Sequence, residues 1–187
     1  MATVEPIRSR EKVFEMLHKL EEKSDRDALL FHLGINTGLR SSDLVRLKFE
    51  DIFENGEIKK HLDIKQKKTG KSQRIKINPL VKDRIREYAR EWDMRVGDWF
   101  FPSYRRPSKH ITTQQVWRRM KPVAEGIGIR NFGTHTMRKT FGYAIYRRTK
   151  DAVLTTTALG QTDWRSTLIY IGINQDAIDY VIVDGGF

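Results

Sequence analysis

Chemistry in this sequence centres on Tyr170, which lies in a short apolar-flanked segment near the end of the chain. Alone, a tyrosine in such a place indicates only a half-buried ring with a solvated hydroxyl. The other segments change that interpretation, because they offer Arg40, Lys68, His135 and Arg138. A tyrosine can attack a phosphodiester when arginines hold the phosphate oxygens, a base accepts the phenolic proton and an acid protonates the leaving oxygen. These five side chains are together the groups that such a reaction needs.

His135 and Arg138 are three residues apart near the start of a predicted helix, so they lie one turn apart on one side of it. The backbone amides and the dipole at a helix start favour an anion. An arginine can donate to two oxygens of a phosphate while a histidine transfers a proton. For this pair alone, the alternative is a surface histidine beside a solvated arginine.

Arg40 follows Gly38, a residue expected to end a helix in the left-handed conformation, so the arginine is held in a turn between helices. Lys68 lies at the tip of a predicted hairpin, where one lysine would protonate a leaving oxygen. The alternatives are a solvated arginine and an exposed basic loop that touches backbone phosphates. Four lysines share the tip and spacing alone does not choose among them: Lys65, Lys67, Lys68 and Lys71.

The formal net charge of +11, from 35 Lys and Arg against 24 Asp and Glu, favours a polyanionic partner such as nucleic acid. Charge does not distinguish DNA from RNA, and a solvated basic surface is the alternative. Besides the hairpin lysines, the residues expected to contact nucleic acid stand in dense basic segments: Arg105, Arg106, Arg118 and Arg119.

Several classes of chemistry are excluded by composition. The chain has no cysteine, which excludes disulfides, thiolate metal sites and cysteine nucleophiles. Its five histidines lack metal-ligand spacing, and it has no glycine-rich nucleotide-binding loop, so we expect no metal and no cofactor. No apolar run approaches the roughly 20 residues of a membrane span. The polar first ten residues do not resemble a secretory signal. We therefore expect a cytoplasmic protein without a membrane partner.

Hydrophobic periodicity predicts one domain of the α+β class, mostly helical, with a small antiparallel hairpin. Helices are expected at 11–23, from Ser24 or Asp25 to Gly38, from Ser41 or Ser42 to about 47, from Pro79 to about 92, at 112–125, from Thr134, at 151–160 and at 166–172. The hairpin strands are expected at 58–66 and 72–78, and a last amphipathic turn at 176–183.

Four short motifs, in order, resemble the boxes of the tyrosine recombinases of the phage integrase family. Thr37–Leu44 resembles their first arginine box, Lys68–Lys71 their lysine turn and His135–Arg138 their His-x-x-Arg box. Leu159–Gln161, followed nine residues later by Tyr170, resembles their last box. Any one box is a weak signal, but all four agree in order and spacing. The resemblance runs from about residue 10 to the end of the chain.

The resemblance implies the helical tyrosine recombinase catalytic core and site-specific DNA recombination. Tyr170 would attack the scissile phosphate to form a 3′-phosphotyrosyl bond and free a 5′-hydroxyl. Arg40 and Arg138 would hold the non-bridging oxygens, and Lys68 would be the general acid. His135 would accept the proton of Tyr170 or bind the phosphate. The reaction requires no metal or nucleotide.

The sequence departs from the family at Gln161, where His or Trp is usual. Glutamine can donate a neutral hydrogen bond to a phosphate oxygen but brings no charge. Trp164, three residues further on, is not assumed to replace it. Two alternative functions therefore stay open. One is topoisomerase-like nicking and religation, and the other is a catalytically weak DNA-binding or regulatory protein with the same fold.

The resemblance also implies partners. Family members usually carry a core-binding domain, often with an arm-binding domain before it, and we expect residues 1–187 to be the catalytic domain alone. Double-stranded DNA would bind it and bring it to the nucleoid, and protomers would form a tetramer in synapsis while remaining monomeric in free solution. The tail, 174–187, has a narrow apolar edge that would dock on its own domain or on a neighbouring protomer: Ile178, Val181 and Ile182.

Overall fold

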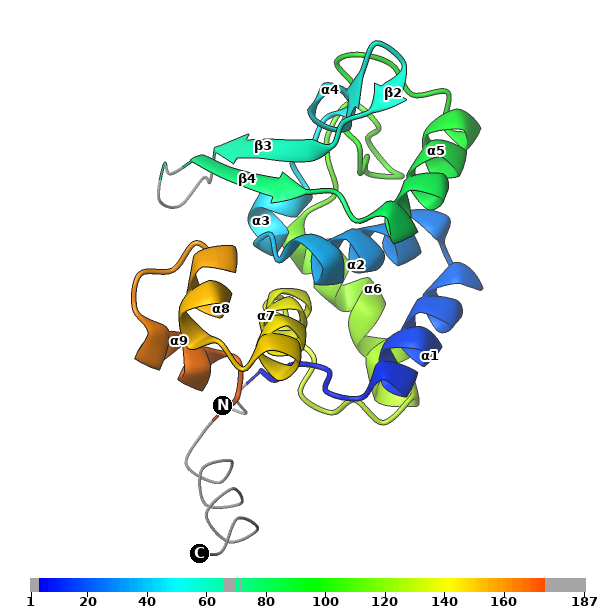
Figure 1. Cartoon of the computed structure of the whole chain (residues 1–187). Coiled ribbons are helices and arrows are strands. Elements are labelled where there is room, and N and C mark those ends of the chain that lie inside the picture. Colours follow the sequence, from blue (N-terminus) through cyan, green and yellow to red (C-terminus); the bar gives the residue numbers. More distant parts are fainter. Residues whose placement is uncertain (1–3, 66–69, 71, 174–187) are drawn as a thin grey trace, which may run out of the picture.

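Helix α2 (Asp25–Thr37) runs through the middle of the molecule and is apolar and buried on nearly every side (Figure 1). The computed structural model describes residues 4–65, 70 and 72–173. At the start of α2 the Ser24 side chain accepts a hydrogen bond from the Asp27 amide, and the helix ends at Gly38 with φ of 64°. A side chain is strained at such an angle, so glycine is favoured there. Both predicted ends of this helix are confirmed.

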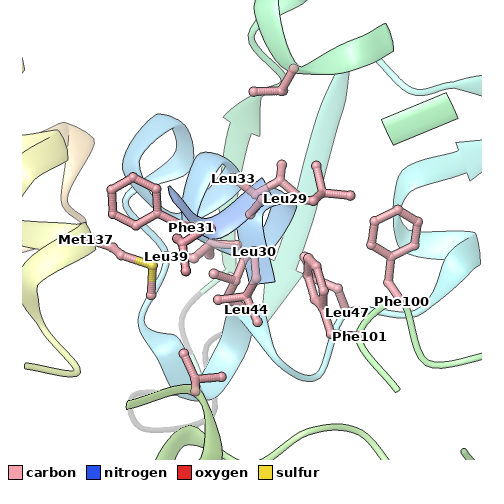
Figure 2. Packing of buried hydrophobic residues seen from close by; sticks show 14 of the residues in the cluster. Leu29, Leu30, Phe31, Leu33, Leu39, Leu44, Leu47, Phe100, Phe101 and Met137 are labelled. Carbon is pink, nitrogen blue, oxygen red and sulfur yellow. The ribbon is translucent and has the colours of Figure 1, made fainter. Parts of the chain in front are cut away.

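Other elements bury their apolar sides against α2. They are α1 (Arg10–Glu21), α3 (Ser41–Leu44), the 3₁₀ helix η1 (Pro79–Val81), α5 (Lys82–Glu91), α6 (Thr113–Gly126) and α7 (Thr136–Thr149). Figure 2 shows the centre of the resulting core, where leucines of α2 meet side chains from α3, α7 and the segment before α6. Its labelled members are Leu29, Leu30, Phe31, Leu33, Leu39, Leu44, Leu47, Phe100, Phe101 and Met137. Full burial of each such side chain stabilises the fold by about 1.5–3 kcal/mol.

Two antiparallel hairpins follow α4 (Phe49–Ile52). The first pairs β1 (Phe53–Glu54) with β2 (Glu57–Ile58), and the second pairs β3 (His61–Lys65) with β4 (Ser72–Lys76). The predicted strand that began at Ile58 is therefore wrong at its start, because Ile58 pairs with Phe53 across the Asn55–Gly56 turn. The longer hairpin is confirmed, with Lys65 opposite Ser72 at the end nearest the connecting turn.

The last described elements are α8 (Ala152–Ala158) and α9 (Trp164–Tyr170), and α8 packs on both α7 and α9. They form the orange part of Figure 1, on the side of the molecule toward which the β3–β4 hairpin points. The Asp163 side chain caps α9 by accepting bonds from the Arg165 and Ser166 amides. The helix therefore begins two residues earlier than predicted.

Two predicted caps are wrong. Thr134 does not cap α7, because His135 occupies that position. Ser41 does not cap α3, because Arg40 does so without a side-chain bond. The Ser41 hydroxyl donates instead to the Thr134 carbonyl, which joins the start of α3 to the turn before α7. At Ser41, a tertiary contact of the hydroxyl stands in place of the local capping bond that the sequence favours.

Helix lengths also differ in detail. α3 ends at Leu44 rather than near Leu47, and the helix predicted from Pro79 is divided into η1 and α5. Within the described ranges, no helix is long and apolar enough to span a membrane. The turn predicted at 176–183, with the rest of the tail, lies outside the described residues.

Candidate active site

Tyr170 and His135 meet although they are 35 residues apart. The Tyr170 hydroxyl lies 3.2 Å from His135 Nδ1, and the two rings are nearly perpendicular, with an interplanar angle of 88°. Tyr170 is the last residue of α9, and His135 is the N-cap residue immediately before α7. A neutral imidazole with a bare Nδ1 accepts a phenolic proton at this distance. The predicted nucleophile and proton acceptor are therefore adjacent.

Arg138 is only 3% exposed and holds together three parts of the chain. Its Nη1 donates to the Gly38 carbonyl at 2.6 Å, and its Nη2 donates to the Leu159 carbonyl. These carbonyls stand at the carboxyl ends of α2 and α8, where helices leave acceptors without intrahelical partners. Arg138 thus has a packing function besides any contact with a phosphate.

The electrostatics of the site couple Tyr170 to both arginines. Burial raises the pKa of the Tyr170 phenol, and the charge and hydrogen bonding of Arg138, followed by the charge of Arg40, oppose that rise. Burial lowers the pKa of Arg138, and the charge of Arg40 lowers it further. An incoming phosphate would neutralise this repulsion between two guanidinium groups. The site therefore favours an anion at this point.

Arg40 is half-buried at the amino end of α3. Its carbonyl accepts hydrogen bonds from the amides of Asp43, at 2.8 Å, and Leu44, at 2.9 Å. The bond from Ser41 to Thr134 fixes this turn next to His135. Arg40 of the first arginine box and His135 of the His-x-x-Arg box therefore lie on neighbouring turns of the chain.

Gln161 is half-buried beside α9, the helix that ends in Tyr170. Its Oε1 is 2.8 Å from the hydroxyl of Thr167, a fully buried residue of α9, and the same hydroxyl is 2.7 Å from the Asp163 carbonyl. With its oxygen engaged there, the amide nitrogen is the part of Gln161 that would donate to a phosphate. Trp164, by contrast, is 46% exposed and contacts Arg165.

Close packing at Gly142 brings the end of α9 against α7. A Cβ added there would lie 2.8 Å from Ile171 Cγ2 and 2.8 Å from Leu159 Cδ1. Ile171 follows Tyr170 and Leu159 carries the carbonyl that Arg138 binds, so both neighbours belong to the site. Any side chain at Gly142 would therefore displace the nucleophile segment from α7.

The lysine turn is only partly described. Lys67, Lys68 and Lys71 lie outside the described residues, and Lys65 is exposed at the end of β3. The turn end of the hairpin is joined to α8, because Gln73 Nε2 donates to the Ala158 carbonyl at 3.0 Å. The lysine turn is therefore followed, within β4, by a residue fixed against α8.

The other basic candidates form a separate group. Arg105, Arg118 and Arg119 line a depression of about 300 Å³ near the start of α6, and none of the predicted catalytic residues contributes to its lining. Arg106 is exposed in the loop before α6. Arg119 Nε donates to the buried carboxylate of Asp27. This ion pair within the fold partly neutralises the charge that Arg119 could offer to a phosphate.

Sequence reasoning missed Lys139, which lies over the Tyr170 ring with its Nζ 4.9 Å from the ring centroid. Its position next to Arg138 in a helix does not indicate such a contact. Across the described part of the chain, no group of three His, Cys, Asp or Glu side chains stands together as a metal site would require.

Two sequence relatives illustrate what this chain resembles. It is 39% identical over 176 residues to a probable integrase/recombinase, YoeC, from Bacillus subtilis (strain 168), and the match covers 94% of this chain and 93% of that protein. It is 29% identical over 163 residues to the tyrosine recombinase XerA from Pyrococcus furiosus, covering 87% of this chain. The chain spans only 55% of the length of XerA.

Among solved structures, the XerH site-specific recombinase bound to palindromic difH substrate, in a post-cleavage complex, has a TM-score of 0.77 to this chain. The match covers 98% of this chain and 54% of XerH, at 20% sequence identity, and so establishes the fold. That fold is the catalytic domain of a tyrosine recombinase. The chain belongs to the phage integrase family, whose model matches residues 9–176. The predicted fold class and family are both confirmed.

Proposed function

We propose that this chain is the catalytic domain of a site-specific DNA recombinase that cuts and rejoins strands through Tyr170. The observation that carries the proposal is the 3.2 Å distance between the Tyr170 hydroxyl and His135 Nδ1. The positive charges of Arg138 and Arg40 also act to lower the pKa of the same phenol. The match to an integrase/recombinase over 93% of its length supports this function.

In the proposed step, the Tyr170 oxygen forms a bond to the scissile phosphorus while the bond to the 5′-oxygen of the next nucleotide breaks. The phenolic proton passes to His135, and Lys68 donates a proton to the leaving 5′-oxygen. Arg40 and Arg138 bind the non-bridging oxygens, on which negative charge builds. The products are a 3′-phosphotyrosyl ester and a 5′-hydroxyl. Attack on that ester by another 5′-hydroxyl rejoins a strand and releases Tyr170.

Gln161 takes a supporting role in this proposal. Its amide would donate one neutral hydrogen bond to a non-bridging oxygen, while Thr167 holds its other end. It supplies less stabilisation than a charged donor, because a neutral amide adds no attraction between opposite full charges.

The decisive experiment uses a duplex nicked close to the scissile phosphate, so that a short 5′-hydroxyl fragment diffuses away after cleavage. We expect a covalent protein–DNA adduct resistant to denaturant, with a free 5′-hydroxyl at the mapped end. Binding without any adduct would identify a DNA-binding protein that only retains the fold. Adduct formation and religation without strand exchange between two sites would identify topoisomerase-like activity.

DNA contact outside the scissile phosphate is proposed for Lys65, Lys67, Lys71 and the basic loop and helix at residues 105–119. Each neutralised phosphate contributes about −0.9 to the slope of log K against log salt. On DNA we propose that protomers assemble as a tetramer in synapsis, with monomers in free solution. Sedimentation with and without a two-site DNA measures both states.

The depression near α6 allows a matched comparison of two neighbouring arginines. Arg118→Ala is expected to weaken DNA binding and to reduce the salt slope by about 1, because it removes a cation from the surface. Arg119→Ala is expected to affect affinity less and stability more, since Arg119 is paired with the buried Asp27. Binding titrations at several salt concentrations and thermal unfolding of both variants test the pair. Equal salt slopes for Arg118→Ala and the wild type would contradict a phosphate contact.

A further inference from the structure

The segment before α1, Val4–Arg8, lies across α7 and reaches the end of α9 (Figure 1). We call it the amino-terminal strap. The Ile7 amide donates to Thr140 Oγ1 at 2.9 Å, and Arg8 Nη2 donates to the Gly172 carbonyl at 3.1 Å. The strap is therefore hydrogen-bonded on one side to the turn that follows α9 and on the other to α7, the helix of the His-x-x-Arg box.

Lys139 connects this strap to the nucleophile. Its Nζ donates to the Val4 carbonyl at 2.8 Å and lies 4.9 Å from the centroid of the Tyr170 ring. The residue is only 8% exposed, and burial lowers the pKa of its ammonium, while the charge of Glu5 raises it. A buried ammonium is costly unless it is hydrogen-bonded, and the Val4 carbonyl supplies that bond.

The position of the ammonium decides what it can do. It contacts the face of the ring, whereas His135 lies at the hydroxyl. A cation over a ring face is attracted by the ring quadrupole, so it holds the ring plane without touching the reacting oxygen. Tyr170 ends a helix of seven residues, and that short helix alone does little to restrain the ring.

We propose that Lys139 is a positioning residue for the Tyr170 ring and that the amino-terminal strap is its anchor. The proposal rests on the assignment of Tyr170 as the nucleophile. A change in the strap then alters cleavage through the orientation of the phenol, because small displacements of a nucleophile have large effects on rate.

The first test removes the charge at Lys139. In Lys139→Met the chain length is nearly kept but the bond to Val4 and the cation are lost. We expect single-turnover cleavage of the nicked duplex to slow by about tenfold, the scale of a desolvated cation–π contact. DNA affinity is expected to stay unchanged, and Lys139→Arg is expected to recover most of the rate. Thermal unfolding confirms that each variant is folded.

The second test displaces the strap and leaves Lys139 in place. In Gly133→Ala the new Cβ would lie 2.5 Å from Val4 Cγ2 and 3.1 Å from Val4 Cγ1, so Val4 must move. The matched control is Gly126→Ala, whose Cβ meets nothing within 4 Å. We expect slower cleavage in the first variant and an unchanged rate in the control.

Two further measurements separate positioning from other roles. A substrate with sulfur in place of the leaving 5′-oxygen needs no general acid, so it should rescue Lys68→Met and leave Lys139→Met slow. The chain has six tyrosines, so ring-labelled tyrosine gives a resolvable NMR spectrum in which Tyr170→Phe assigns the Tyr170 signal. That signal should shift in both Lys139→Met and Gly133→Ala.

Wild-type rates in Lys139→Met, rescue of that variant by the sulfur substrate, or a loss of DNA affinity equal to the loss of rate would overturn the role of Lys139. Equal rates in Gly133→Ala and Gly126→Ala would overturn the anchoring by the strap. Failure of the wild-type protein to form an adduct would instead reject the proposed function, which keeps the two conclusions separate.

Discussion

Tyr170→Phe is expected to bind DNA as the wild type does and to form no covalent adduct. The substitution removes the only atom of Tyr170 that can bond to phosphorus and keeps the ring over which Lys139 lies. Loss of one hydroxyl that meets a solvent-exposed histidine should change the free energy of unfolding by no more than about 1 kcal/mol. Adduct formation on the nicked duplex, measured beside DNA affinity, checks both expectations.

Tyr146→Phe is the matched control, because it makes the same change at a half-buried position in α7. It should cleave at the wild-type rate. An adduct that persists in Tyr170→Phe would show that another residue is the nucleophile, and Tyr180 in the tail would be the first to replace.

Arg138→Ala is expected to abolish cleavage and to destabilise the fold. The buried guanidinium binds the carbonyls of Gly38 and Leu159, and each buried acceptor left without a donor costs about 1–3 kcal/mol. Removing a donor to the transition state costs about 3–4 kcal/mol more in the activation free energy. Arg138→Lys should not rescue either loss, because an ammonium cannot reproduce the planar arrangement of guanidinium donors.

Arg40→Ala separates these two contributions. Arg40 is half-buried at the start of α3, so its removal should slow cleavage by about 10²- to 10³-fold with a smaller loss of stability. Thermal unfolding and single-turnover cleavage of both variants give the comparison. If Arg40→Ala and Arg138→Ala lowered the thermal stability equally, the packing role of Arg138 would be contradicted. If each variant lost as much DNA affinity as cleavage rate, both arginines would only bind DNA and would not act in the transition state.

Two kinds of feature could be predicted from the sequence: those that depend on the conformation of one residue, and those carried by the ordered set of four motifs. Gly38 ends α2 as expected, because only its own backbone conformation is involved. Tyr170, His135 and Arg138 come together as the four boxes imply. The catalytic roles of these residues and of Lys68 and Gln161 stay predictions.

Features that depend on distant contacts were not predicted. Ser41 bonds to Thr134 instead of capping α3, since a partner 93 residues away competes with the local amide. The same holds for Arg119, which was predicted only to bind DNA and which pairs with Asp27. The packing of Lys139 on Tyr170 likewise requires the strap and α9 to approach α7, and no sequence pattern specifies that approach.

Under the proposed function, the placement of Tyr170 and His135 at opposite kinds of helix end would favour a protonated tyrosine until DNA binds. Tyr170 ends α9, where partial negative charge disfavours a phenolate, and His135 begins α7, where partial positive charge disfavours an imidazolium. Both effects oppose proton transfer before DNA arrives. A phosphate held at the start of α7 reverses the second effect, since its negative charge favours a protonated histidine. In the proposed reaction, bound DNA would therefore promote proton transfer from Tyr170 to His135.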